Sequence, residues 1–232
     1  MGPLCVRCGL PFASFHALDS SAAECGACRK DAPAFDAART FGVYTGKLRQ
    51  AVLRLKFAGD DRLGARLGEL LAPTWDSLPQ VNEGELPLIV PVPLHVSRQR
   101  ERGFNQTVLL AAGLVRALRK QGARGAPQVA NTCLRRKRAT PPQTGLSVAA
   151  RRENLRGAFE VVRPEQVRGS SMVLVDDVMT TGATLSACAW TLKRAGAARV
   201  MGLVLARATP QFPDFRRDDR DNPVDGLSGD ST

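Results

Sequence analysis

Three short apolar runs alternate with amphipathic stretches along the chain. The runs cover residues 86–93, 172–175 and 199–206, and each has the length of a buried strand. Between the second and third runs, residues 184–195 have helical spacing and end at Gly196, a residue typical of the end of a helix. This strand, helix, strand order predicts an α/β fold with a mainly parallel central sheet flanked by helices, whose ligands bind at the carboxyl ends of the strands.

Helical spacing also occurs on either side of the first apolar run. Residues 47–72 predict two amphipathic helices joined by a turn at 58–61, and residues 105–121 predict a further helix. Residues 121–149 are rich in Gly, Pro and Arg and poor in apolar residues, which indicates a long, mobile loop or hairpin. The residues after 209 are rich in Asp, Pro, Gly and Ser, so we expect them to be disordered.

Composition places the chain among ordinary globular proteins, with 44% apolar and 24% charged residues in a length of 232. It contains no run of about 18 apolar residues, and its start has no basic segment followed by an apolar one. We therefore expect a cytoplasmic protein that does not insert into a membrane.

The net positive charge of the chain favours anionic ligands. The net charge is +11, and residues 1–206 keep 29 of the 33 basic and 16 of the 22 acidic residues, a net charge of +13. Such an excess suits a polyphosphate ligand or a nucleic-acid surface, and it is also found on Arg-rich surfaces that only confer solubility. Charge alone does not choose among these three.

Four of the six cysteines form two C-x-x-C pairs near the N-terminus. The pairs are Cys5 with Cys8 and Cys25 with Cys28, and 16 residues separate them. This spacing is typical of a tetrahedral zinc site between two knuckles, in a segment with too few apolar residues to fold alone. Because four thiolates leave no open position for water, the zinc would be structural. Two redox-active cysteine pairs are the alternative.

A second motif follows the apolar run at 172–175. Two carboxylates, Asp176 and Asp177, end the strand, and a turn then opens a helix. This phosphate turn consists of Thr180, Thr181, Gly182, Ala183 and Thr184. Backbone N–H groups at the start of a helix have no partners within the helix and bind phosphate. The glycine lets the backbone approach the ligand or adopt a conformation forbidden to residues with a Cβ. Adjacent carboxylates accept hydrogen bonds from a sugar diol and hold hydrated magnesium nearby, although helix capping would also explain them.

Two basic loops precede this motif in the chain. Arg98, Arg100 and Arg102 follow the first apolar run, and Lys137 and Arg138 lie in the segment 135–146. Arginine forks match phosphate oxygens, so these five residues are candidates for a pyrophosphate clamp, and the second segment could close over a substrate. Exposed basic turns and a nucleic-acid patch are the alternatives.

Residues 173–185 resemble the phosphoribosyl pyrophosphate signature of type I phosphoribosyltransferases. The resemblance implies that Asp176 and Asp177 hold the ribose 2- and 3-hydroxyls and that the turn from Thr180 to Thr184 holds the 5-phosphate. The purine-salvage branch of that family has an aspartate in place of Thr180, near the purine base. This difference argues against a 6-oxopurine acceptor.

More of the chain resembles the ComF family, also called GntX-like, of competence-associated proteins. The resemblance includes residues 55–57, 91–94, 102–106 and 138–154, the acidic turn and the cysteine-rich start. It implies a magnesium-dependent phosphoribosyltransferase that binds phosphoribosyl pyrophosphate, carries a zinc module and is linked to natural transformation and DNA uptake. The acceptor stays undefined. The alternatives are a non-catalytic phosphoribosyl pyrophosphate-binding adaptor of the DNA-uptake proteins and a single-stranded DNA-binding accessory protein, for which the 5% content of aromatic residues offers few stacking surfaces.

These patterns divide the chain into four expected segments. They are a four-cysteine zinc-binding module at 1–40, a helical connecting segment at 41–85, a phosphoribosyltransferase-like domain at 86–207 and a disordered tail at 208–232.

Overall fold

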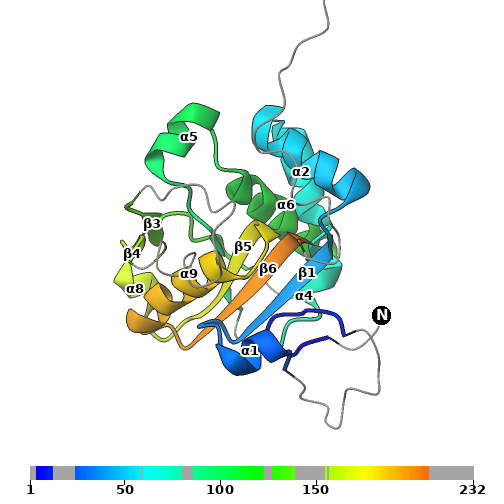
Figure 1. Cartoon of the computed structure of the whole chain (residues 1–232). Helices are drawn as coiled ribbons and strands as arrows, with labels where there is room; N and C mark the ends of the chain where they lie inside the picture. The colour runs from blue at the N-terminus through cyan, green and yellow to red at the C-terminus, as the bar shows by residue number, and fades with distance from the viewer. Residues whose placement is uncertain are drawn as a thin grey trace, which may run out of the picture.

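A parallel β-sheet forms the centre of the protein (Figure 1). The computed structural model describes residues 4–12, 24–58, 60–79, 86–122, 127–138, 155 and 157–208. Within these residues the sheet has the strand order β1-β6-β5-β2, and neighbouring strands are parallel. Its strands are β1 (Ala37–Val43), β2 (Leu88–Pro91), β5 (Ser171–Met179) and β6 (Arg199–Arg207).

Helices connect the strands and cover the sheet. They are α1 (Gly26–Lys30), α2 (Gly46–Ala58), α3 (Asp61–Glu69), α4 (Ala72–Trp75), α5 (Val96–Arg102), α6 (Gln106–Lys120), α8 (Pro164–Val167) and α9 (Ala183–Arg194). The helices expected within 47–72, 105–121 and 184–195 are present as α2 with α3, α6 and α9. The expected parallel sheet flanked by helices is therefore confirmed.

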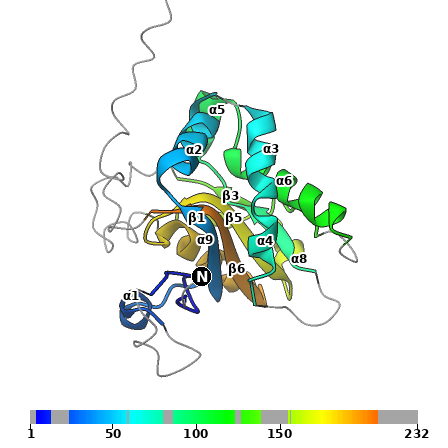
Figure 2. The same cartoon turned by 90° about the vertical axis from the view of Figure 1, so that its right-hand side faces the viewer.

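The two faces of the sheet pack against different layers. Along β5, Val173 and Val175 join the core beneath α2, α3 and α6, while Met172 and Leu174 join the core beneath α9. Figure 2 shows α2, α3 and α6 on one side of the sheet and α9 on the other. Because successive side chains of a strand point to opposite faces, this alternation also determines where the polar residues at the end of β5 point.

Small residues bring α3 and α6 into direct contact. A Cβ added at Gly68 would collide with the backbone carbonyl of Leu110, and one added at Gly113 would collide with that of Ala65. Close backbone contact of this kind fixes the position of α6 on the sheet. It thereby fixes Gln106, the first residue of α6, which lies in the candidate site.

Three local features were not expected from the sequence pattern. Residues 96–102, expected as a loop, form α5, with His95 as the N-cap and Gly103 at φ 76° after its last residue. The segment expected as a loop or hairpin at 121–149 contains β3 (Leu134–Arg136), which pairs antiparallel with β4 (Phe159–Val161) beyond that segment. Strand β1 crosses the expected boundary at residue 40, since its partner is β6.

The cysteine module, defined here as residues 4–12 and 24–30, lies along the outer strand β1. The N–H of Ala38 donates to the carbonyl of Arg7 at 2.7 Å, and Arg39 donates through Nη1 to the carbonyl of Val6 at 3.0 Å. The module thus pairs with an edge strand that would otherwise leave its backbone groups exposed.

Two further expectations concern the membrane and the tail. Among the residues that the structure describes, no helix is long and apolar enough to span a bilayer. Of the expected tail at 208–232, only Ala208 is described, and it is buried, with its N–H donating to the carbonyl of Met179 at 2.9 Å. The other residues of the tail, and those at 139–154, lie outside the described residues.

Candidate functional site

The two carboxylates expected at the end of β5 lie within that strand, and both are buried. Asp177 faces the layer of α2 and α6. Its Oδ2 accepts a hydrogen bond from Nε2 of Gln106 at 2.8 Å and lies 3.4 Å from Nζ of Lys56. Burial alone would lower the pKa of Lys56, but the attraction of Asp177, Tyr44 and Asp176 together outweighs burial and raises it. Lys56 is therefore charged, and it compensates the buried carboxylate.

Asp176 has a different environment. Its Oδ1 accepts a hydrogen bond from the backbone N–H of Asp177 at 2.9 Å. Burial, followed by repulsion from Asp177, raises the pKa of Asp176 to about 8 despite the attraction of Lys56 and Arg136. Burial and the neighbouring carboxylate therefore favour the protonated form of Asp176.

The phosphate turn has the backbone that the sequence pattern predicts. Gly182 has φ 79°, in the left-handed region, and α9 begins at the next residue, Ala183. Thr181 is exposed, and its Oγ1 accepts a hydrogen bond from the N–H of Ala183 at 3.4 Å. Thr180 and Thr184 are half-buried. The turn thus places hydroxyl groups and the start of a helix beside the two carboxylates, an arrangement suited to a phosphate ester.

The three arginines of α5 divide into two kinds. Arg98 and Arg100 are exposed. Arg102 is half-buried, its guanidinium lies 5.8 Å from the centre of the Phe57 ring, and its Nη1 donates to Oε1 of Gln106 at 3.5 Å. Since Gln106 binds Asp177, Arg102 is the arginine of α5 that the structure connects to the acidic pair.

The second basic segment begins with β3. Lys137 and Arg138, the candidates named from the sequence, have exposed side chains. The preceding residue, Arg136, is half-buried, stacks on the Phe159 ring at 5.5 Å, and acts electrostatically on Asp176 and Cys188. Residue 95 forms a parallel bridge with residue 136, so the start of α5 and the end of β3 lie side by side.

Sequence reasoning did not single out Lys56, Gln106 or Arg136. Lys56 interrupts an apolar stretch between Leu55 and Phe57, and a charge at such a position is a signal for a buried partner. Gln106 is a polar residue at the buried start of a helix. Arg136 lies among other basic residues and gives no signal that separates it from them.

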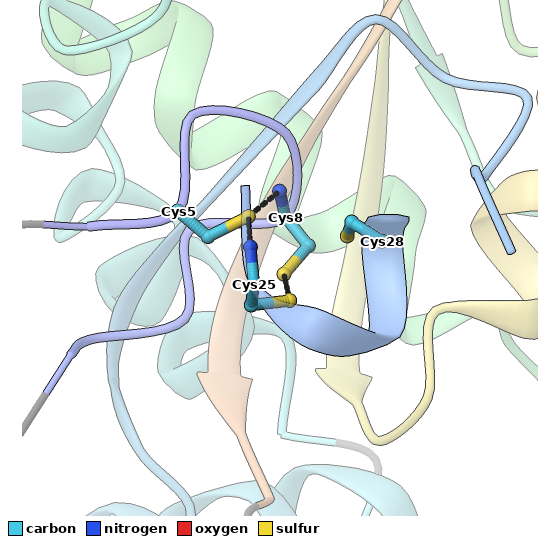
Figure 3. A group of neighbouring side chains, drawn as sticks. All are labelled: Cys5, Cys8, Cys25 and Cys28. Carbon is cyan, nitrogen blue, oxygen red and sulfur yellow. Dashed lines mark hydrogen bonds between the residues drawn. The ribbon is translucent and has the colours of Figure 1, made fainter. Parts of the chain in front are cut away.

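The four N-terminal cysteines converge as the spacing predicts (Figure 3). All four are buried, and their sulfurs lie within 4.8 Å of one another. Sγ of Cys8 and Sγ of Cys25 are 3.7 Å apart. A tetrahedral zinc ion with bonds of about 2.3 Å holds its sulfurs about 3.8 Å apart, so the residues fit a zinc site with four cysteine ligands.

Backbone hydrogen bonds favour the thiolate of Cys5, whereas burial raises the pKa of the Cys8 and Cys28 thiols. Sγ of Cys5 accepts hydrogen bonds from the N–H groups of Cys8 and Cys25, at 3.5 and 3.2 Å. Burial raises the pKa of the Cys5 thiol, but these backbone donors outweigh it and lower that pKa to about 7. Arg207, from the end of β6, donates to the carbonyl of Cys8 at 2.5 Å and to its sulfur at 3.6 Å. A site with such donors is suited to a cation that binds thiolates.

The chain is similar to a known domain family and to several curated proteins. The phosphoribosyl transferase domain model matches residues 107–225. The chain is 36% identical over 205 residues to DNA utilization protein YhgH of Escherichia coli strain K12, covering 88% of this chain and 84% of the relative. It is 34% identical over 208 residues to competence protein F of Haemophilus influenzae, covering 89% and 85%. The chain belongs to the ComF family.

A more distant ComF-family relative is competence protein ComFC of Bacillus subtilis. It is 28% identical over 211 residues, which cover 89% of this chain and 79% of the relative. Together with the parallel sheet, the match of the domain model gives this ComF-family chain a type I phosphoribosyltransferase fold. Among solved structures, a hypoxanthine phosphoribosyltransferase from Staphylococcus aureus is similar, with a TM-score of 0.38, 12% identity and coverage of 69% of this chain and 70% of that one.

Proposed function

We propose that this protein binds phosphoribosyl pyrophosphate with magnesium at the carboxyl end of β5 and transfers the phosphoribosyl group. The observation that carries the proposal is the buried acidic pair, Asp176 and Asp177, followed directly by the left-handed Gly182 and the start of α9. Two carboxylates buried beside a phosphate-binding turn have a natural ligand in a sugar that bears a phosphate.

Asp176 and Asp177 would hold the ribose hydroxyls. Asp177 is already held in place by Gln106 and Lys56, so its second oxygen can accept a hydrogen bond without reorganisation of the site. Asp176 would lose its proton when a ligand that donates hydrogen bonds or a cation arrives, because either one favours the ionised carboxylate.

The 5-phosphate would be held by the turn at Thr180, Thr181, Gly182, Ala183 and Thr184. The first N–H groups of α9 have no partner within the helix, and they carry the positive end of the helix dipole. The hydroxyl of Thr181 is exposed beside them. This half of the site needs no cation from elsewhere in the chain.

The pyrophosphate would lie on the side of α5 and β3. Arg98, Arg100, Arg102, Lys137 and Arg138 are the residues assigned to it from the sequence. Of these, Arg102 is connected to Asp177 through Gln106, and Arg136 joins them because of its electrostatic contact with Asp176. These cations would stabilise the negative charge that develops on the departing pyrophosphate.

Magnesium and zinc would have separate roles. The oxygen donors of the acidic pair suit hydrated magnesium, which would neutralise pyrophosphate charge, whereas the four sulfurs of the cysteine module suit zinc. With its four protein ligands the zinc site is closed to substrate. Its role would be structural.

The names of the relatives support a role in the use of DNA. Those relatives are called competence and DNA utilization proteins. We therefore propose that the phosphoribosyl transfer serves natural competence or the use of incoming DNA, in the cytoplasm, with an acceptor that the residues named here do not identify.

Calorimetric titration with phosphoribosyl pyrophosphate and magnesium tests the ligand. The native chain should bind, and Asp177→Asn should weaken binding at least ~10-fold, because it removes one of the two charges of the acidic pair. Glu165→Gln, on the exposed surface of α8, is the matched control and should bind like the native chain. Absence of binding by the native chain would contradict the proposal.

Turnover needs a second measurement. Pyrophosphate release by the native chain over a panel of nitrogen heterocycles, and with single-stranded DNA present, should reveal an acceptor that Asp177→Asn cannot use. Tight binding without release across that panel would favour the non-catalytic adaptor.

A further inference from the structure

The segment that follows the cysteine module leads directly to the phosphate turn. After α1, which carries Cys28, the N–H of Ala34 donates to Oγ of Ser186 in the first turns of α9, at 3.0 Å. The next residue, Phe35, is buried, and a Cβ added at Gly182 would lie 3.4 Å from Cε1 of its ring. The exit of the phosphate turn is therefore packed against a side chain that comes from the segment directly after the module.

The entry of the turn is connected to the module as well. Met179 is the last residue of β5 and lies in register with Arg207 of β6. Arg207 donates to both the carbonyl and the sulfur of Cys8. The Met179 sulfur and the Phe35 ring pack on the same side of Gly182. A Cβ added at Gly182 would lie 3.6 Å from this sulfur. Groups connected to the cysteine module thus lie beside Met179, just before the phosphate turn, and beside Gly182 within it.

Asp36 anchors the connecting segment to the sheet and to the far end of α9. Its backbone N–H donates to the carbonyl of Val200, and its Oδ2 accepts from the N–H of the same residue, both at 2.8 Å. Its Oδ1 lies 2.6 Å from Nζ of Lys193 in the last turn of α9. Residues 34–36 therefore form a brace along α9. The cysteine module directly precedes this brace in the chain.

We infer that the metal site of the cysteine module and the phosphate turn are energetically coupled, with Phe35 as the positioning residue between them. This inference rests on the proposed function, since it concerns the 5-phosphate half of the same site. The phosphate turn needs Gly182 in a left-handed conformation. The Phe35 ring and the Met179 side chain pack beside Gly182 and stabilise that conformation. Without the metal, the four cysteine sulfurs are no longer held together. The cysteine module then no longer fixes the position of residues 34–36.

Coupling of this kind acts in both directions. If the metal raises the affinity of the turn for phosphate, then phosphate must raise the affinity of the module for the metal by the same factor. The reciprocal effect can be measured on the metal itself, without any enzymatic activity. Ribose 5-phosphate is the suitable probe, because it carries the 5-phosphate and lacks the pyrophosphate that would chelate zinc in solution.

The experiment uses the full chain loaded with zinc. The extent of zinc loss to a chromogenic chelator at equilibrium is measured with and without ribose 5-phosphate, and the affinity for ribose 5-phosphate is measured with and without zinc. In the native chain we expect ribose 5-phosphate to raise the affinity for zinc about five-fold or more, the lower range of ordinary allosteric coupling. In Phe35→Ala both effects should shrink together, and in Phe35→Leu they should partly return.

Leu192→Ala is the matched control. Leu192 is buried in the same core beneath α9 but near its other end, so its truncation also leaves a cavity without touching the phosphate turn. It should lower stability while retaining the coupling. If Leu192→Ala loses the coupling as Phe35→Ala does, the effect of Phe35 is general destabilisation and the positioning role is wrong.

The remaining outcomes separate the inference from the proposed function. Binding of ribose 5-phosphate to the native chain with no change in zinc loss would overturn the coupling and leave the phosphate site standing. No binding of ribose 5-phosphate or of phosphoribosyl pyrophosphate to the zinc-loaded chain would overturn the proposed function and the inference together. Coupling that persists in Phe35→Ala would overturn the role of Phe35.

Discussion

Asp176 and Asp177 are adjacent in the chain, yet their carboxylates lie on opposite faces of the central sheet. The carboxylate of Asp177 contacts Gln106 and Lys56 in the layer of α6 and α2. Asp176 instead interacts electrostatically with Cys188 of α9 and with Arg136 of β3. Lys56 attracts both carboxylates. The pair is therefore not two equivalent acids, because each carboxylate has its own partners and its own electrostatic environment.

The first prediction concerns the proton on Asp176. Its pKa is raised from 3.8 to about 8 in the folded protein, so between about pH 4 and pH 8 the folded state holds a proton that the unfolded state has lost. The free energy of unfolding should therefore fall as pH rises through that window and level off above it. Asp176→Asn, which cannot ionise, should flatten this dependence in urea unfolding at a series of pH values.

Glu165→Gln provides the comparison for Asp176→Asn, since it removes an exposed carboxyl on α8. It should keep the pH dependence of the native chain. Identical pH profiles for native protein and Asp176→Asn would show that Asp176 is ionised in the folded state.

The second prediction concerns Lys56, which compensates Asp177. Lys56→Met should lower the free energy of unfolding by about 1–3 kcal/mol, because it leaves a buried carboxylate with one fewer partner. Its side chain is 23% exposed, so water offsets part of the loss. Urea unfolding at neutral pH measures the change. Lys47→Met, an exposed position on the same helix, should change it little, and equal losses in both variants would contradict the role of the ion pair.

The third prediction concerns the backbone of the phosphate turn. Gly182→Ala should cost about 1–2 kcal/mol, since a residue with a Cβ is strained at φ 79°, and it should also weaken ribose 5-phosphate binding. Gly169→Ala imposes similar strain at φ 75°, at a turn where an added Cβ meets no atom within 4 Å. Thermal unfolding and calorimetry should show a stability loss in both variants but weakened binding in Gly182→Ala alone. Weakened ribose 5-phosphate binding in Gly169→Ala would indicate that backbone strain outside the phosphate turn is enough to weaken binding.

The fourth prediction concerns the cysteine module. The purified chain should contain about one zinc ion, and Cys8→Ser should lose most of it, because Cys8 supplies one of four converging sulfurs. Cys133→Ala removes a buried thiol outside the module and should keep the metal. Elemental analysis by mass spectrometry measures the zinc content of each variant. Equal zinc content in native protein and Cys8→Ser would exclude the four-sulfur site.

Several features could be predicted because they depend on residues close together in the chain. The two C-x-x-C pairs, the strand that ends in two aspartates and the glycine of the turn each carry their chemistry within a short segment. Local pattern also located α2, α3, α6 and α9, since the apolar face of each helix repeats along its own sequence. The conformation of Gly182 followed from its place between a strand and a helix.

Other features have no apolar pattern of their own, and two of them depend on partners that lie far apart in the chain. Helix α5 formed where a basic loop was expected, because His95 caps it and Gly103 ends it in a segment without an apolar face. Strand β1 was missed because its residues became a strand only by pairing with β6, more distant in sequence than any other pair in the described sheet. Arg136 was not distinguished from its basic neighbours until β3 paired with β4.

By itself, the sequence determined the chemical groups of this protein: four thiols at metal spacing, an acidic pair, a phosphate turn and an excess of arginine. Tertiary structure alone decided how those groups are used. It gave Asp177 the ammonium of Lys56, placed Asp176 near Cys188 and Arg136, and brought Phe35 against Gly182. The physical reason is that burial and the distance to a partner control charge, proton affinity and backbone strain, and both arise only when distant segments pack together.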